Sequence, residues 1–173
     1  MDNMRFERWI RASHALATVE PFMTLTVQGL GKIDSELFQK DQQYRKLCID
    51  SNMGVQEATN FTDFFTLSYL WVLGAYEVVR TITQRFKQTD GPTAPRYIKS
   101  QELKKLFERV RIPLAKFEPS ERYKKIDSKV AYPSLTFEHG IAWQVSEKDF
   151  ISRGELSEAF IKFMEWLRND YHT

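Results

Sequence analysis

The sequence predicts a mainly α-helical fold, a single-domain bundle around a long central helix at about 63–87 with one small β-hairpin at about 134–146. The length of 173 residues suits one domain with a substantial core and is too short to expect two. Apolar residues make up 42% and aromatic residues 14%, a globular composition. The stretch TLSYLWVLGAYEVVRT is apolar on nearly every side, which is typical of a helix surrounded by protein. We therefore expect residues 1–173 to form one helical domain with a β-hairpin insertion.

The N-terminal segment carries apolar residues at helical spacing over residues 3–19, and Pro21 is placed to end that helix. The following MTLTVQG alternates like a strand, although a helix continuing past Pro21 would also bury some of these residues. Asp34 or Ser35 is a plausible N-cap for a polar helix with a narrow apolar stripe. SNMGVQEATN then breaks that helix.

The central helix is the strongest local signal. The hydroxyl of Thr62 can cap a helix running from Asp63 to about Lys87. The loop TDGPTAP follows, and Ser100 can cap a second, basic helix that ends before Pro113.

The hairpin prediction depends on two alternating runs, SLTFE and IAWQV, on either side of His139 and Gly140. A glycine tolerates the positive φ that tight hairpin turns require. After the hairpin, Ser152 and Glu155 form a capping box for a final apolar helix.

Cysteine content and hydropathy indicate the compartment. The single Cys48 cannot form an internal disulfide, which favours a reducing compartment, and the cytoplasm is the simplest such compartment. The N-terminus lacks the apolar run of a signal peptide, and no apolar run is long enough to span a membrane. We therefore expect a soluble cytoplasmic protein without a membrane partner.

Charge is unevenly distributed along the chain. Residues 85–129 hold 13 Lys and Arg against 6 Asp and Glu, a surplus of seven positive charges. This surplus predicts a basic face for an anionic partner such as RNA or DNA, with Tyr97 or Tyr123 available to stack on bases. An acidic protein would satisfy the same charges, and a solvated helical face is the structural alternative. The candidate nucleic-acid-binding residues are Arg96, Lys99, Lys104, Lys105, Arg109, Arg111, Lys124 and Lys125.

The strongest enzyme motifs are absent from the sequence, which lacks a phosphate-binding glycine loop, a paired-cysteine metal pattern and a nucleophile turn. We predict no cofactor and no metal site. Glu77 and Arg80 are three residues apart and should form a partly buried ion pair beside Gly74. The pair would either fix helix register or serve a site, with Glu77 as a base and Arg80 as an anion clamp.

The run SYLWVLGAYEVVR in a helical order of this kind resembles the HEPN superfamily, small helical proteins of which many are ribonucleases or nucleic-acid-binding partners in conflict systems. Active members place an Arg a few residues before a His. Arg8 and His14 match that spacing, on the first helix instead of a late one, whereas Arg168 and His172 are one residue short of it. The resemblance implies a metal-independent ribonuclease in which His14 or His172 acts at a ribose 2′-hydroxyl while Arg stabilises the phosphorane, often across a dimer.

Three functions follow as hypotheses. The first is a small binding or interaction domain that associates with nucleic acid through residues 85–129. The second is the HEPN-like ribonuclease, with Arg8, His14, Glu77 and Arg80 as candidate catalytic residues. The third is a structural subunit or oligomerisation protein, a homodimer or a complex with another protein, which an exposed Trp143 on the hairpin would favour.

Overall fold

A computed structural model describes residues 1–50, 55–136 and 140–170. Its α-helices are α1 (Asn3–Ser13), α2 (Met23–Asp50), α3 (Val55–Thr89), α4 (Pro95–Lys116) and α5 (Arg153–Asp170). Two short 3-10 helices, η1 (His14–Leu16) and η2 (Glu121–Tyr123), and three strands complete it, namely β1 (Tyr132–Thr136), β2 (Gly140–Gln144) and β3 (Phe150–Ser152). The predicted mainly helical fold is confirmed. None of the helices in the described ranges is long and apolar enough to cross a membrane.

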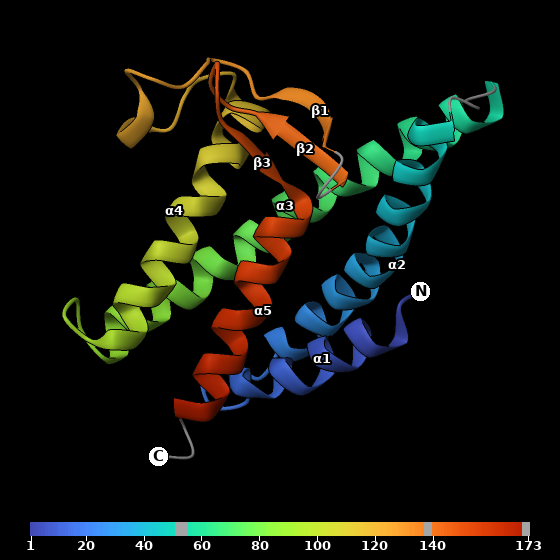
Figure 1. The fold of residues 1–173 in the computed structure, drawn as a ribbon. Coiled ribbons are helices and arrows are strands. Elements are labelled where there is room, and N and C mark those ends of the chain that lie inside the picture. The colour runs from blue at the N-terminus through green and yellow to red at the C-terminus, as the bar shows by residue number, and fades with distance from the viewer. Residues whose placement is uncertain (51–54, 137–139, 171–173) are drawn as a thin grey trace.

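The helices enclose one aromatic core. Figure 1 shows α5 between α4 and the α1–α2 pair, with α3 behind it and the small sheet at one end. The rings of Trp9 and Phe160 meet edge to face with centroids 5.3 Å apart, and Phe107 lies 6.2 Å from Phe160. Trp71 adds a fourth ring, 6.5 Å from Trp9. These rings join α1, α3, α4 and α5, and burying such large side chains is the main source of stability.

The first helix ends earlier than the sequence indicated. α1 ends at Ser13, whose hydroxyl donates to the carbonyl of Ile10, and the 3-10 turn η1 follows. α1 lies very close to α2, because a Cβ on Gly31 would be 2.4 Å from the Cβ of Trp9. A glycine is therefore required where these two backbones meet.

The predicted strand at MTLTVQG is wrong, and the helical alternative is correct. α2 begins at Met23 and buries Val27 and Leu30, while Leu25 points to solvent. The prediction of an N-cap at Asp34 or Ser35 is also wrong, since both residues are buried in the middle of α2. A short polar side chain in mid-helix has the same local sequence signature as a cap.

The central helix is confirmed and is longer than predicted, starting at Val55. Thr62 is therefore internal, and its carbonyl accepts a hydrogen bond from the hydroxyl of Thr66. Residues 51–54, where the sequence predicted part of a break, lie outside the described residues. The expectation that protein surrounds α3 is wrong in part, because Leu67 and Leu70 are exposed.

Both predicted ends of α4 are wrong. The N-cap is Ala94, with Pro95 at the first helical position, and Ser100 lies buried one turn inside. A proline is tolerated in the first turn because its missing N–H has no helical acceptor there. Pro113 is also inside α4, which continues to Lys116 and ends where Phe117 adopts a left-handed φ of 56°.

The hairpin is confirmed and gains a third strand, because β2 pairs antiparallel with both β1 and β3. Its turn residues 137–139, which include His139, lie outside the described residues. Trp143 is fully buried, so it is not the exposed aromatic residue that would favour binding of a protein partner at the hairpin. The capping box is confirmed, since Ser152 Oγ accepts from the Glu155 N–H at 3.0 Å and the Ser152 N–H donates to Glu155 at 2.7 Å.

Candidate functional site

The ion pair of Glu77 and Arg80 forms as predicted, at 2.8 Å, but it is not partly buried. The two side chains are 49% and 40% exposed, and Arg111 of α4 lies 3.7 Å from Glu77. The close approach at Gly74 is made by Leu30 of α2, whose Cδ2 would lie 3.4 Å from a Cβ placed there. The cavities described below are lined by neither Glu77 nor Arg80.

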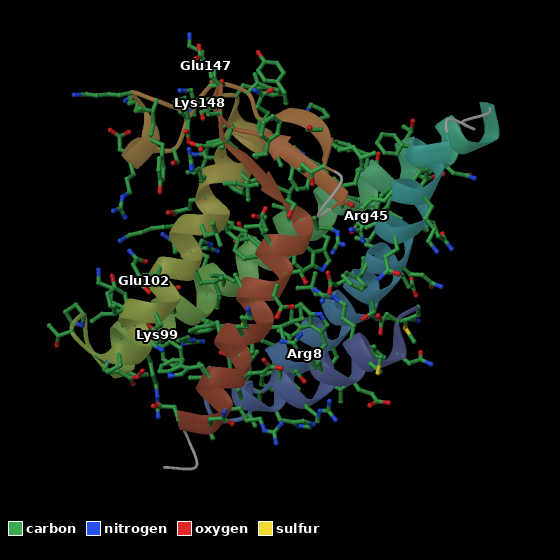
Figure 2. The ribbon with its side chains drawn as sticks, in the orientation of Figure 1. Arg8, Arg45, Lys99, Glu102, Glu147 and Lys148 are labelled. Atoms are coloured by element: carbon green, nitrogen blue, oxygen red, sulfur yellow. The ribbon has the colours of Figure 1, made fainter. Side chains whose placement is uncertain are left out.

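Arg8 and His14, the predicted catalytic pair, lie on successive elements, α1 and η1. The guanidinium of Arg8 faces α5 (Figure 2), where it binds Glu165 at 2.7 Å and Glu158 at 3.0 Å. His14 is exposed. The contacts of Arg8 therefore tie α1 to α5, and His172 lies outside the described residues.

The most unusual feature of the interior is a buried charge network that sequence reasoning missed. Arg153, at the start of α5, is fully buried and forms ion pairs with Asp34 and Asp41 of α2. Asp34 also accepts hydrogen bonds from Arg5 Nε at 2.6 Å and from the indole of Trp9 at 2.8 Å. The network thus joins α1, α2 and α5, with two arginines matched by two aspartates.

The two carboxylates respond differently to burial. Burial alone would raise the pKa of Asp34, but its pairs with Arg153 and Arg5 outweigh that effect and hold the pKa below the ordinary value. Asp41 has one arginine partner and the backbone N–H of Ile141, which donates at 3.0 Å. Burial therefore prevails and raises the pKa of Asp41, and the negative charge of Asp34 adds to the rise.

A cavity of about 500 Å³ lies beside this network, between α2 and α5. Its charged lining is balanced and already paired. Arg5 stacks on Phe38, with the guanidinium 4.6 Å from the ring centroid, while Glu158 binds Arg8. Because these groups have partners inside the protein, the arrangement stabilises helix packing. The lining residues are Arg5, Phe38, Asp41, Arg45, Gly154, Glu155, Glu158, Ala159 and Lys162.

Most of the predicted nucleic-acid-binding residues also have partners. Arg96 binds Asp170 at 2.8 Å, and Lys99 lies over the ring of Trp166 at 4.2 Å. Figure 2 shows Lys99 on α4 near Glu102. The remaining pairs are Lys104 with Glu108, Arg109 with Asp127 and Asp149, Arg111 with Glu77, and Lys124 with Glu121.

Basic residues from two parts of the segment meet at a cleft between α4 and η2. This α4–η2 cleft has a volume of about 220 Å³ and is lined by Gln101, Lys105, Glu108, Ile112, Ser120, Glu121, Arg122 and Tyr123. Arg109 lies over the Tyr123 ring, 4.3 Å from its centroid. Lys105 of α4 thus shares one concave surface with Arg122 and Tyr123, which lie 17 and 18 residues further along the chain.

Among the described residues, no group of three or more His, Cys, Asp or Glu side chains is arranged to hold a metal ion. Comparison of the chain with protein-family models, curated proteins and solved structures finds no match.

Proposed function

We propose that this chain is a nucleic-acid-binding domain whose α4–η2 cleft contacts the phosphate backbone and one base of RNA or DNA. The observation that carries the proposal is the convergence of Lys105 and Arg122 with Tyr123 on one cleft. Cations that follow a backbone beside an aromatic stacking platform are the usual elements of single-strand binding.

The charge balance of the cleft supports an anionic ligand. Its carboxylates, Glu108 and Glu121, each have a lysine partner, at 2.7 Å for Lys104 and 3.5 Å for Lys124. In the described part of the chain, Lys105 and Arg122 form no ion pair, so the cleft together with Lys104 and Lys124 at its carboxylates has four cations against two carboxylates. A phosphate can bind them without displacing an internal carboxylate, which makes them better contacts than the paired residues of the same segment.

Tyr123 is held in place by its neighbours. Arg109 covers the ring and is itself bound to Asp127, whose carboxylate it contacts through Nε at 2.9 Å and Nη2 at 2.8 Å. An aromatic side chain that is already oriented loses less entropy when a base stacks on it.

Fluorescence anisotropy with labelled single-stranded RNA and DNA tests the proposal. We expect binding at low salt, and each of K105A and R122A should reduce the slope of log K against log salt by about 0.7, one phosphate contact. K46A removes an exposed lysine of α2 and is the matched control, expected to leave binding unchanged. If the wild type does not bind at low salt, or if K46A weakens binding as much as K105A, the proposal is wrong. Capture of an acidic protein through the same residues would favour the protein-binding alternative.

A second arm separates binding from the HEPN-like ribonuclease alternative. RNA incubated with the protein in chelator should remain intact if the cleft only binds. Cleavage that persists in chelator and is lost in both R8A and H14A would instead support the metal-independent ribonuclease, despite the structural contacts of Arg8.

A further inference from the structure

The α2–α3 hairpin presents an exposed apolar surface on the side away from the core. This outer face is formed by Phe22, just before α2, Leu25, Gly29 and Ile33 of α2, and Leu67 and Leu70 of α3. We infer that the outer face binds a second copy of this chain, forming a homodimer. This inference is independent of the nucleic-acid proposal.

The outer face is continuous across the two helices. The indole of Trp71 donates to the carbonyl of Leu30 at 2.9 Å, and Leu30 Cδ2 would lie 3.4 Å from a Cβ placed on Gly74. α2 and α3 therefore touch at this level. Ile33 is one turn from Leu30 and Leu70 is adjacent to Trp71, so both lie on the solvent side of the same contact.

The exposed area is large for a monomer. Phe22 is 89% exposed and Leu25 77%, while Leu70, Leu67 and Ile33 are 53%, 42% and 39% exposed. Taking roughly 200 Å² for a fully exposed large side chain, these five present on the order of 600 Å². That is the upper end of the largest apolar patch on typical monomers, and it is most of the roughly 800 Å² that each partner buries in a standard interface.

The charge pattern favours a copy of the same surface as the occupant. Residues 23–31 and 64–76 contain no charged side chain, and the exposed Lys32 lies beside Ile33 at the edge of the face. C-terminal to these uncharged residues of α3, Glu77 pairs with Arg80 and Arg85 pairs with Glu20, both at 2.8 Å. An uncharged patch is complementary to itself under two-fold symmetry, and homodimer interfaces are more apolar than transient ones. A membrane-binding helix would carry a rim rich in Lys and Arg.

Gly29 provides an independent observation. A glycine inside an exposed helix costs about 1 kcal/mol relative to alanine. Gly29 does not have a positive φ, and a Cβ placed on it would meet nothing within 4 Å. The fold of one copy therefore does not require glycine at this position, whereas a closely packed second backbone does.

Sedimentation equilibrium over a range of micromolar concentrations tests the inference. We expect the wild type to dimerise, and L25D and L70D should each weaken the dimer by at least about tenfold, because each places a charge in the apolar contact. I98D alters a side chain of α4 that is 46% exposed and lies outside the outer face, and it should dimerise like the wild type. Circular dichroism establishes that each variant is folded.

Two results would overturn the inference. One is a wild-type protein that stays monomeric at every concentration. The other is a dimer that L25D and L70D leave unchanged. A monomer that co-floats with phosphatidylcholine vesicles and loses this binding in L25D would assign the face to a lipid surface instead.

Discussion

The buried network predicts a large loss of stability when Asp34 is truncated. Asp34 is fully buried and accepts hydrogen bonds from Arg5, Trp9 and Arg153, three groups on two other helices. In D34A, Arg5 loses its buried carboxylate partner and keeps Ser157 and the more distant Glu158, while Arg153 retains only Asp41. A guanidinium left in the interior with one carboxylate cannot recover its hydration, so the folded state bears the cost.

The expected magnitude is about 3–5 kcal/mol, the usual cost of breaking a buried ion pair by removing one partner. A domain of this kind has a total stability of roughly 5–15 kcal/mol, so D34A should be marginal. In a thermal melt the loss corresponds to roughly 6–20 °C in Tm for a chain of this size. Urea denaturation followed by tryptophan fluorescence measures it, at one fixed protein concentration so that any self-association contributes equally.

E77A is the matched control, because Glu77 also pairs with an arginine but at the surface. It should cost no more than about 0.5 kcal/mol. A double-mutant cycle of D34A with R153M isolates the pair, and we expect a coupling energy well above that of the surface pair. If D34A costs less than about 1 kcal/mol, or no more than E77A, the buried network does not stabilise the fold through its ion pairs.

Three further predictions concern single positions. Burial raises the pKa of Asp41 in the folded protein above an unfolded value of about 3.9, so the stability that Asp41 contributes is fully present below that pH and is lost as pH rises through the folded pKa. D41N should abolish this decline of the urea midpoint with pH, and a D41N profile identical to that of the wild type would contradict the prediction. G140A should lower the free energy of unfolding by about 1–3 kcal/mol in the same assay, because Gly140 has φ +75° and a Cβ placed on it would overlap the carboxylate of Asp41. A stability equal to that of the wild type would refute this close approach of β2 to α2. S152A removes a capping-box hydroxyl and should lower stability by about 1 kcal/mol, whereas a neutral result would mean that Glu155 alone caps α5.

The elements that sequence predicted well depend on local signals. The central helix, the hairpin and the capping box of Ser152 and Glu155 are each specified by residues close together in the chain. The error at Asp34 occurred where distant partners decide the conformation. Asp34 has the local signature of a cap, but its arginine partners are 29 and 119 residues away. Its spacing of seven from Asp41 places both carboxylates on one face of α2, and that is the signal that could have revealed them.

The candidate site also depends on partners that are distant in the sequence. The charge surplus of residues 85–129 predicted a basic surface, but sequence could not show which cations internal carboxylates would bind. Arg109 and Arg111 face carboxylates from outside α4, whereas Lys105 meets Arg122 at a cleft that exists only once η2 folds against α4. Net charge along a sequence therefore overestimates the charge that remains available to a partner.

The two proposed surfaces can be tested together, because they lie on different parts of the fold. Figure 1 shows α4 and α2 on either side of α5, so a dimer formed through the outer face of α2–α3 would leave the α4–η2 cleft of each copy accessible. Two clefts on one dimer should bind a long strand more tightly than a short one, since the second contact becomes intramolecular. L25D should therefore weaken binding of a long RNA that can span both clefts and leave a short oligonucleotide unaffected, whereas K105A should weaken both. Equal effects of L25D on the two lengths would show that the dimer does not bring two clefts to one strand, and unchanged short-strand binding in K105A would remove the cleft itself.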